Sequence, residues 1–222
     1  MGPGFILLSY LGGSVSFPAV LARARGIDLR RTGSRKLGGS NLIRQAGAPL
    51  GITAGVLDGL KGLAAVLLAR WLGLPLEIQL AAGIAAVAGQ LWPVFHGFDG
   101  GRANATGWGF CVGVDGVASL IMAVPVMSAL VLRAAIPVHP TRLLPVGALA
   151  SFVVWPAVIW EQEGTTMQVV AGLVILALIL LRRLSAGLGA DRALHAPLWR
   201  ILANRALFDR SELQERGAVS IS

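Results

Sequence analysis

Apolar residues gather into six long stretches along the chain, separated by short polar segments rich in glycine, proline and charge. The stretches lie at about residues 3–22, 48–72, 76–96, 107–134, 142–160 and 165–184, and an α-helix needs roughly 20 apolar residues to cross a bilayer. No internal repeat and no linker between two domains is evident. The pattern therefore predicts an all-α, polytopic membrane protein.

Composition supports this class and excludes others. The chain has 222 residues, of which 55% are hydrophobic and 14% charged, and its mean hydropathy is +0.72. A soluble domain of this length needs far more surface charge. The formal net charge is +8, but the basic residues are scattered between apolar stretches, so nucleic-acid binding is not expected. The single cysteine, Cys111, excludes an internal disulfide and a cysteine metal cluster.

The distribution of basic residues predicts which way the helices cross the membrane. Residues 23–44 carry six arginines and one lysine against a single aspartate, which places this loop in the cytoplasm and the amino terminus outside. If residues 107–134 formed one span, every later loop would break the positive-inside rule. A split at Asp115-Gly116 restores it, with a short helix near 104–114 and a second helix near 116–134. We predict seven segments, with the amino terminus outside and the carboxyl terminus in the cytoplasm.

A basic tail, residues 185–222, follows the predicted transmembrane domain of residues 1–184. It mixes arginines with Leu198, Trp199, Ile201, Leu207 and Phe208. Two interpretations stay open: an amphipathic cytoplasmic helix that lies on anionic lipid, or a solvated and partly disordered tail.

Three polar stretches fall on the same predicted side of the membrane: "TGSRKLGGSNLIR" at 32–44, "GGRANAT" at 100–106 and "HPTR" at 139–142. The first two combine glycines, hydroxyl groups and basic side chains. Backbone N–H groups, a following helix amino terminus and arginine together favour phosphate binding. The alternative is ordinary, because cytoplasmic loops between spans usually contain these residues.

Ionisable residues inside the apolar stretches are few. Asp58 and Lys61 in "VLDGLKG" lie three residues apart on one helix face, where they either neutralise each other in a functional site or reach toward the interface. His96, His139 and His195 show no metal-ligand spacing, and no Ser-His-Asp order is present. We therefore expect no metal and no cofactor.

Several motifs, taken in order, resemble the bacterial acyl-phosphate:glycerol-3-phosphate acyltransferases, the PlsY family. "LGGSVSFPAVLARARGIDLRRTGSRKLGGSNLIRQAG" resembles the amino-terminal pattern of the family. "VLDGLKGLAAVLLA" is similar to its second-helix motif, "GQLWPVFHGFDGGRANAT" to its third-helix motif, and "HPTRLLPVGALASF" to a later threonine-arginine segment. The resemblance covers about residues 5–184 and implies a seven-helix, multi-pass enzyme of the bacterial plasma membrane.

The resemblance also implies a reaction. An acyl group would pass from acyl phosphate to the 1-hydroxyl of glycerol 3-phosphate and give lysophosphatidic acid, without a metal or an acyl-enzyme, while substrate phosphate helps to accept the proton. Acyl phosphate, glycerol 3-phosphate and membrane lipid would be the partners. The candidate catalytic residues are Ser34, Asn41, Arg44, Arg102 and Thr106. The candidate substrate-binding residues are Gly33, Arg35, Lys36, Ser40, Gly100, Gly101, Asn104 and Arg142.

Some positions depart from the family pattern. Gln90 stands where the family has histidine, Asp99 and Arg102 stand where it has lysine, and Pro145 and Ala148 stand where it has serines. These departures motivate an alternative, a non-catalytic paralogue that binds a phospholipid or a phosphorylated metabolite. A small transporter is a further alternative. The placing of the polar motifs at one face of the membrane argues against it, because a transporter binds its substrate near the midplane.

Overall fold

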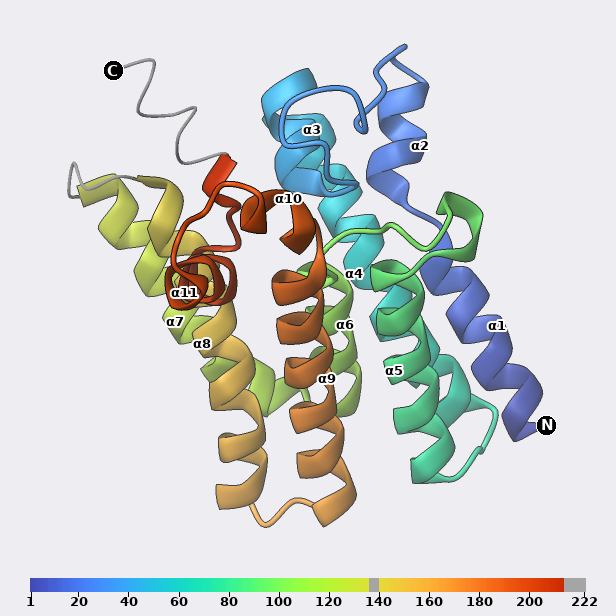
Figure 1. Cartoon of the computed structure of the whole chain (residues 1–222). Coiled ribbons are helices and arrows are strands. Elements are labelled where there is room, and N and C mark those ends of the chain that lie inside the picture. Colours follow the sequence, from blue (N-terminus) through green and yellow to red (C-terminus); the bar gives the residue numbers. More distant parts are fainter. Residues whose placement is uncertain (136–139, 214–222) are drawn as a thin grey trace.

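The computed structural model describes residues 1–135 and 140–213, and within this part the regular structure is entirely helical. Six helical segments of it are long and apolar enough to cross a membrane. They lie in α1 (Gly2–Ser14) together with α2 (Phe17–Arg23), α4 (Ala48–Trp71), α5 (Leu76–Leu91) together with the 3-10 turn that follows it to His96, α7 (Gly116–Ala135), α8 (Pro140–Glu161, of which Leu143–Glu161 is the span) and α9 (Thr166–Ser185). Figure 1 shows them side by side, and the chain reverses direction from each span to the next except from α5 to α7, which run the same way. The protein is a multi-span integral membrane protein.

The first span is broken between α1 and α2. Ser16 caps α2 by accepting a hydrogen bond from the Ala19 N–H at 3.3 Å, and a proline follows at the start of the helix. The break leaves carbonyl groups without helical partners. Lys61 of α4 donates to two of them, Gly13 O at 3.0 Å and Val15 O at 2.5 Å. The break is therefore stabilised from a neighbouring helix, as a membrane interior requires.

A short helix, α6 (Asn104–Val114), lies inside the bundle. Its 11 residues extend roughly 16 Å, which is too short to span a bilayer. It packs closely on α4 because both helices carry glycine at the contact: a Cβ at Gly109 would lie 1.8 Å from Gly59 O. At its end, Arg70 donates to Gly113 O at 3.0 Å and so satisfies a free helical carbonyl. The predicted split at Asp115-Gly116 is confirmed, since α7 begins at Gly116.

The larger apolar core surrounds α6 and receives buried side chains from α4, α5, α7, α8 and α9. Phe110 of α6 and Trp155 of α8 are fully buried, with ring centroids 6.0 Å apart. The Trp155 indole donates to Ser119 Oγ of α7 at 3.2 Å, so its polar atom is also satisfied. Large apolar side chains on the outer faces are exposed, as at Leu120 and Leu173, which suits a surface that faces lipid.

One end of the bundle collects the polar loops. The loop after α2, α3 (Gly39–Ala46), η1 (Val94–His96), the start of α6 and the described part of the tail lie in the upper half of the bundle in Figure 1. The α8–α9 loop lies at the opposite end with Glu161 and Glu163. The basic loops thus lie at one end of the bundle and this acidic loop at the other, as the predicted order of the segments requires.

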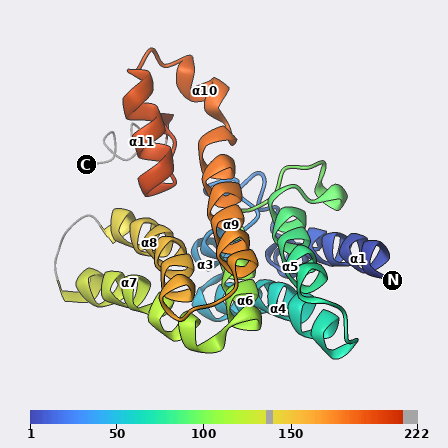
Figure 2. The ribbon, with the colours of Figure 1, turned by 90° about the horizontal axis from the view of Figure 1, so that it is seen from below.

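The described part of the tail is packed against the bundle. It contains α10 (Leu188–Arg192) and α11 (Leu198–Phe208). Helix α11 is seen end-on in Figure 1 and lengthwise in Figure 2, so it crosses α8 and α9 instead of running parallel to them. Ile201 is 1% exposed on its inner face, while Trp199 is 73% exposed. The amphipathic helix is therefore present, and its contact with lipid stays a prediction.

Candidate functional site

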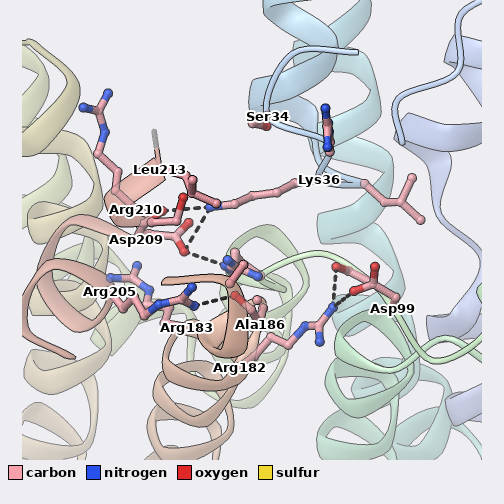
Figure 3. A pocket seen from close by; sticks show the side chains of 17 residues that line it. Ser34, Lys36, Asp99, Arg182, Arg183, Ala186, Arg205, Asp209, Arg210 and Leu213 are labelled. Atoms are coloured by element: carbon pink, nitrogen blue, oxygen red, sulfur yellow. Dashed lines mark hydrogen bonds and ion pairs between the residues drawn. The ribbon is translucent and has the colours of Figure 1, made fainter. Parts of the chain in front are cut away.

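A cavity of ≈ 220 Å³ opens where the loop after α2, the turn before α6, the end of α9 and the tail meet (Figure 3). The charged side chains that line it are mostly basic: Arg35, Lys36, Arg102, Arg182, Arg183, Arg205 and Arg210, against Asp99 and Asp209. Segments far apart in sequence thus supply one electropositive chamber. Such a lining favours a ligand with more than one negative charge.

The loop at 32–38 owes its shape to Asn41. This side chain is fully buried in α3; its Nδ2 donates to the carbonyl oxygens of Leu29, Thr32 and Lys36, each at 3.2 Å, and its Oδ1 accepts from the Ser34 N–H at 3.0 Å. Gly33 has φ +57°, and a Cβ there would lie 2.4 Å from Asn41 Oδ1. Asn41 therefore positions the loop and does not line the cavity. Ser34 lines it, and its buried Oγ has no hydrogen-bond partner among the described residues.

The turn at Gly100-Gly101 packs against the end of α5. Gly100 N–H donates to Leu91 O at 3.2 Å and Gly101 N–H to Gln90 O at 3.1 Å. A Cβ at Gly100 would lie 2.3 Å from Gln90 O, and one at Gly101 would lie 2.8 Å from Leu37 O. The expectation that these two N–H groups cradle an anion is wrong, because they satisfy helix carbonyls. The glycines instead let the turn pass between two neighbouring segments.

Two predicted phosphate-binding residues meet in the cavity at a tail carboxylate (Figure 3). Arg102 Nε lies 2.5 Å from Asp209 Oδ1, and Lys36 Nζ lies 3.3 Å from the same oxygen and donates to Asp209 O at 2.8 Å. Burial lowers the pKa of Lys36 to about 8, although Asp209 opposes this shift. Burial acts to raise the pKa of Asp209, but Arg102 and then Lys36 outweigh it and hold that pKa below its usual value.

The end of α9 adds two arginines. Arg182 pairs with Asp99 and also donates to Gly100 O at 3.0 Å, which ties α9 to the turn (Figure 3). Arg183 is 1% exposed and donates to Pro145 O at 3.2 Å and Ala206 O at 3.0 Å. Its Nε and Nη2 have no hydrogen-bond partner, and no carboxylate of the described residues lies within 4.0 Å of it. This buried cation of the cavity is thus not in direct contact with a carboxylate of the described residues.

Other predicted site residues lie elsewhere. The Thr106 hydroxyl is fully buried and donates to Asp58 O of α4 at 3.0 Å, so it joins two helices and does not line the cavity. Arg44 and Ser40 are exposed on α3, outside the cavity lining. Asn104 begins α6, and its buried Oδ1 has no partner. The side chain of Arg142, like His139, lies outside the described residues.

The pair Asp58 and Lys61 forms a closed network inside the bundle. Lys61 Nζ lies 2.9 Å from Asp58 Oδ1, so of the two interpretations that the sequence left open, the structure shows mutual neutralisation. Gln90 of α5 donates to Asp58 Oδ2 at 2.9 Å and accepts from Lys61. The Phe17 N–H at the start of α2 completes the set at 3.4 Å from Asp58 Oδ1. These contacts join α4 to α2 and α5 and leave neither charge directed at the cavity.

Comparison with known proteins decides the family. A family model described as "Glycerol-3-phosphate acyltransferase" matches residues 4–186. The chain belongs to the glycerol-3-phosphate acyltransferase family. This confirms the resemblance seen in the sequence motifs and makes the protein a member of an enzyme family of lipid synthesis. The tail from residue 187 onward lies outside the matched region.

Individual members of the family are similar to this chain in sequence and in structure. Glycerol-3-phosphate acyltransferases of Geobacter sulfurreducens and Pseudomonas aeruginosa are 34% and 38% identical, over 79% and 76% of this chain and 86% and 87% of theirs. "Glycerol-3-phosphate acyltransferase 4" of Dehalococcoides mccartyi is 43% identical, but the match spans only 54% of either chain. A crystal structure of PlsY in its glycerol 3-phosphate form has a TM-score of 0.74 and 26% identity, covering 87% of this chain and 92% of that chain.

Sequence reasoning missed four residues that shape the cavity: Arg182, Arg183, Arg205 and Asp209. The paired arginines at the end of the last apolar stretch carried a signal, because two cations at a span end commonly face a polar site or the headgroups. No local sequence pattern pointed to Asp209. The arrangement can bind and stabilise phosphate groups through charge-assisted hydrogen bonds from several directions.

Proposed function

We propose that this protein transfers an acyl group from acyl phosphate to the 1-hydroxyl of glycerol 3-phosphate. The observation that carries the proposal is the convergence of Lys36 and Arg102 on one point of an electropositive cavity, in a chain of this family. Both side chains come from segments whose motifs match the family. An anionic oxygen already occupies that point, which supports its use by a substrate phosphate.

Positioning and charge stabilisation supply the catalysis in this proposal. The substrate hydroxyl attacks the acyl carbon, the bond from that carbon to the phosphate oxygen breaks, and the departing phosphate takes the hydroxyl proton. Arg102 and Lys36 hold the phosphate of glycerol 3-phosphate, while Arg182 and Arg183 face the phosphate of the donor. The unpartnered Ser34 hydroxyl is available to donate to either substrate. Fixed cations in a small chamber stabilise the charge that develops on the leaving group.

The cavity lies at the cytoplasmic face in this proposal. The support is the gathering of the basic loops and the tail at the same end of the bundle, opposite Glu161 and Glu163. In a Cys111→Ala background, a membrane-impermeant thiol reagent added to intact cells should label a cysteine at Glu163 and leave one at Arg25 unlabelled. Labelling in the reverse pattern would contradict the orientation.

The activity is tested with purified protein, acyl phosphate and glycerol 3-phosphate, by measuring lysophosphatidic acid and released phosphate. Formation of both products in equal amounts is the expected result. Phosphate release without lysophosphatidic acid would point to another acyl acceptor. Saturable glycerol 3-phosphate binding without any turnover would instead favour a non-catalytic paralogue.

A further inference from the structure

The described part of the tail forms one wall of the cavity, and buried polar contacts hold it there. Arg205 of α11 pairs with Asp191 of α10 at 2.5 Å, and the side chains of both residues are almost fully buried, at 3% and 0% exposure. Arg183 of α9 donates to Ala206 O of α11 at 3.0 Å. These contacts place the residue that ends α11, Asp209, inside the cavity. The tail is therefore built onto the site, although it lies outside the region that matches the family.

Asp209 makes the contacts that a substrate phosphate would make. Its carboxylate lies 2.5 Å from Arg102 Nε and 3.3 Å from Lys36 Nζ, and its side chain is 17% exposed. The residue has φ +51°, a left-handed conformation that turns the chain back toward the cavity at the end of α11. A carboxylate between an arginine and a lysine offers the same charge-assisted hydrogen bonds as a phosphate oxygen, with less negative charge.

The lining of the cavity keeps an excess of positive charge when Asp209 is in place. Arg183 is 1% exposed, and its Nε and Nη2 have no hydrogen-bond partner among the described residues. A single carboxylate shared by Arg102 and Lys36 cannot neutralise this third cation. A phosphate dianion would neutralise more of the chamber than the carboxylate does, because it brings a second charge and further acceptor oxygens.

We propose that Asp209 is an internal competitor for the phosphate site: it occupies the place between Lys36 and Arg102 until a substrate phosphate displaces it. The proposal rests on the assignment of those two cations to substrate phosphate. The tail thus acts as a strap that closes the empty cavity and opens when a phosphate-bearing ligand enters. Its affinity for the site sets the ligand concentration at which the site fills.

Equilibrium binding of inorganic phosphate, without an acyl donor, tests the proposal independently of activity. Asp209→Asn keeps the shape of the side chain and suits the left-handed backbone, since asparagine adopts it readily. If the carboxylate fills the site about nine-tenths of the time, Asp209→Asn should bind phosphate about tenfold more tightly than the unmodified protein. Glu212→Gln is the matched control, because it removes a tail carboxylate that pairs with Arg200 and does not line the cavity.

The outcomes separate the possibilities. Tighter binding in Asp209→Asn and unchanged binding in Glu212→Gln would support the competitor. Weaker binding in Asp209→Asn would overturn it and show that the carboxylate holds Lys36 and Arg102 in place for the ligand. Equal affinity in both variants and the unmodified protein would overturn the competitor alone. Absence of phosphate binding in every protein would overturn the proposed phosphate site together with it.

Discussion

Two clusters in this protein each centre on one carboxylate. They differ in how many of the surrounding donors and acceptors are hydrogen-bonded. In the first, Asp58 is shared by Lys61 and Gln90 between α4 and α5. In the second, Asp209 is shared by Lys36 and Arg102 between the tail and two loops. Each has one carboxylate at its centre and receives a hydrogen bond from at least one segment distant in sequence.

The difference lies in the remaining donors and acceptors. Lys61 Nζ also donates to Gly13 O and Val15 O, and the Phe17 N–H donates to Asp58. The first cluster is therefore closed, and its charges cancel within the bundle. The second borders a cavity and lies beside Arg183, whose Nε and Nη2 have no hydrogen-bond partner in the part of the chain that the structure describes. A closed cluster joins helices, whereas an open cluster with surplus charge is suited to bind a ligand.

The largest effect is expected from opening the closed cluster. Asp58→Ala leaves Lys61 buried without a counter-ion, and breaking such a pair costs about 3–5 kcal/mol. The free energy of unfolding in detergent, measured by denaturant titration, should fall by that amount. The double variant Asp58→Ala with Lys61→Met should regain much of the loss, because no charge is left unpaired. Similar stability of the unmodified protein and Asp58→Ala would show that the cluster is not a structural tie.

Removing one cation of the open cluster should weaken ligand binding and leave the fold intact. Arg102→Ala deletes a charge-assisted hydrogen bond of about 1.5–3 kcal/mol, so glycerol 3-phosphate should bind about tenfold to a hundredfold more weakly. Arg102→Lys keeps the charge and should recover part of the affinity. The matched control is Arg25→Ala, which removes the same charge from an exposed position outside the cavity. An equal loss in Arg25→Ala would mean that only the overall field matters.

A smaller effect should appear on raising the pH. Lys36 has a pKa of about 8 because burial disfavours its cation, so it is charged below pH 8 and neutral above. Phosphate affinity should therefore fall as the pH rises, by about tenfold between pH 7 and pH 9. Lys36→Arg stays charged throughout this range, and its affinity should change little. Parallel pH profiles for the two proteins would remove Lys36 from the ligand contacts.

The comparison also shows which features the sequence could predict. The spans, the short α6 and the turn at Asp115-Gly116 followed from hydrophobic length and the placing of arginines, which are properties of local sequence. The pairing of Asp58 with Lys61 followed from their spacing on one helix. These features depend on the local chain and on the membrane, so one sequence suffices to predict them.

Side-chain direction at the site depended on packing and escaped prediction. The Thr106 hydroxyl donates to α4, and the Gly100 and Gly101 N–H groups donate to α5, although all three seemed available to a phosphate. The contact between Lys36 and Asp209 joins positions 173 residues apart, and no local pattern announces it. The sequence predicts residue types with phosphate chemistry as a class, but which of them meet is decided by the tertiary structure.

An experimental structure with glycerol 3-phosphate bound tests the central claim most directly, because it locates the phosphate. We expect the phosphate between the Arg102 guanidinium and Lys36 Nζ, with donor-to-oxygen distances of about 2.7–2.9 Å, and with the Asp209 carboxylate moved out of that position. A phosphate held instead by Arg44 and Ser40 on α3, while Asp209 still contacts Arg102 and Lys36, would contradict the assignment of the open cluster to the substrate.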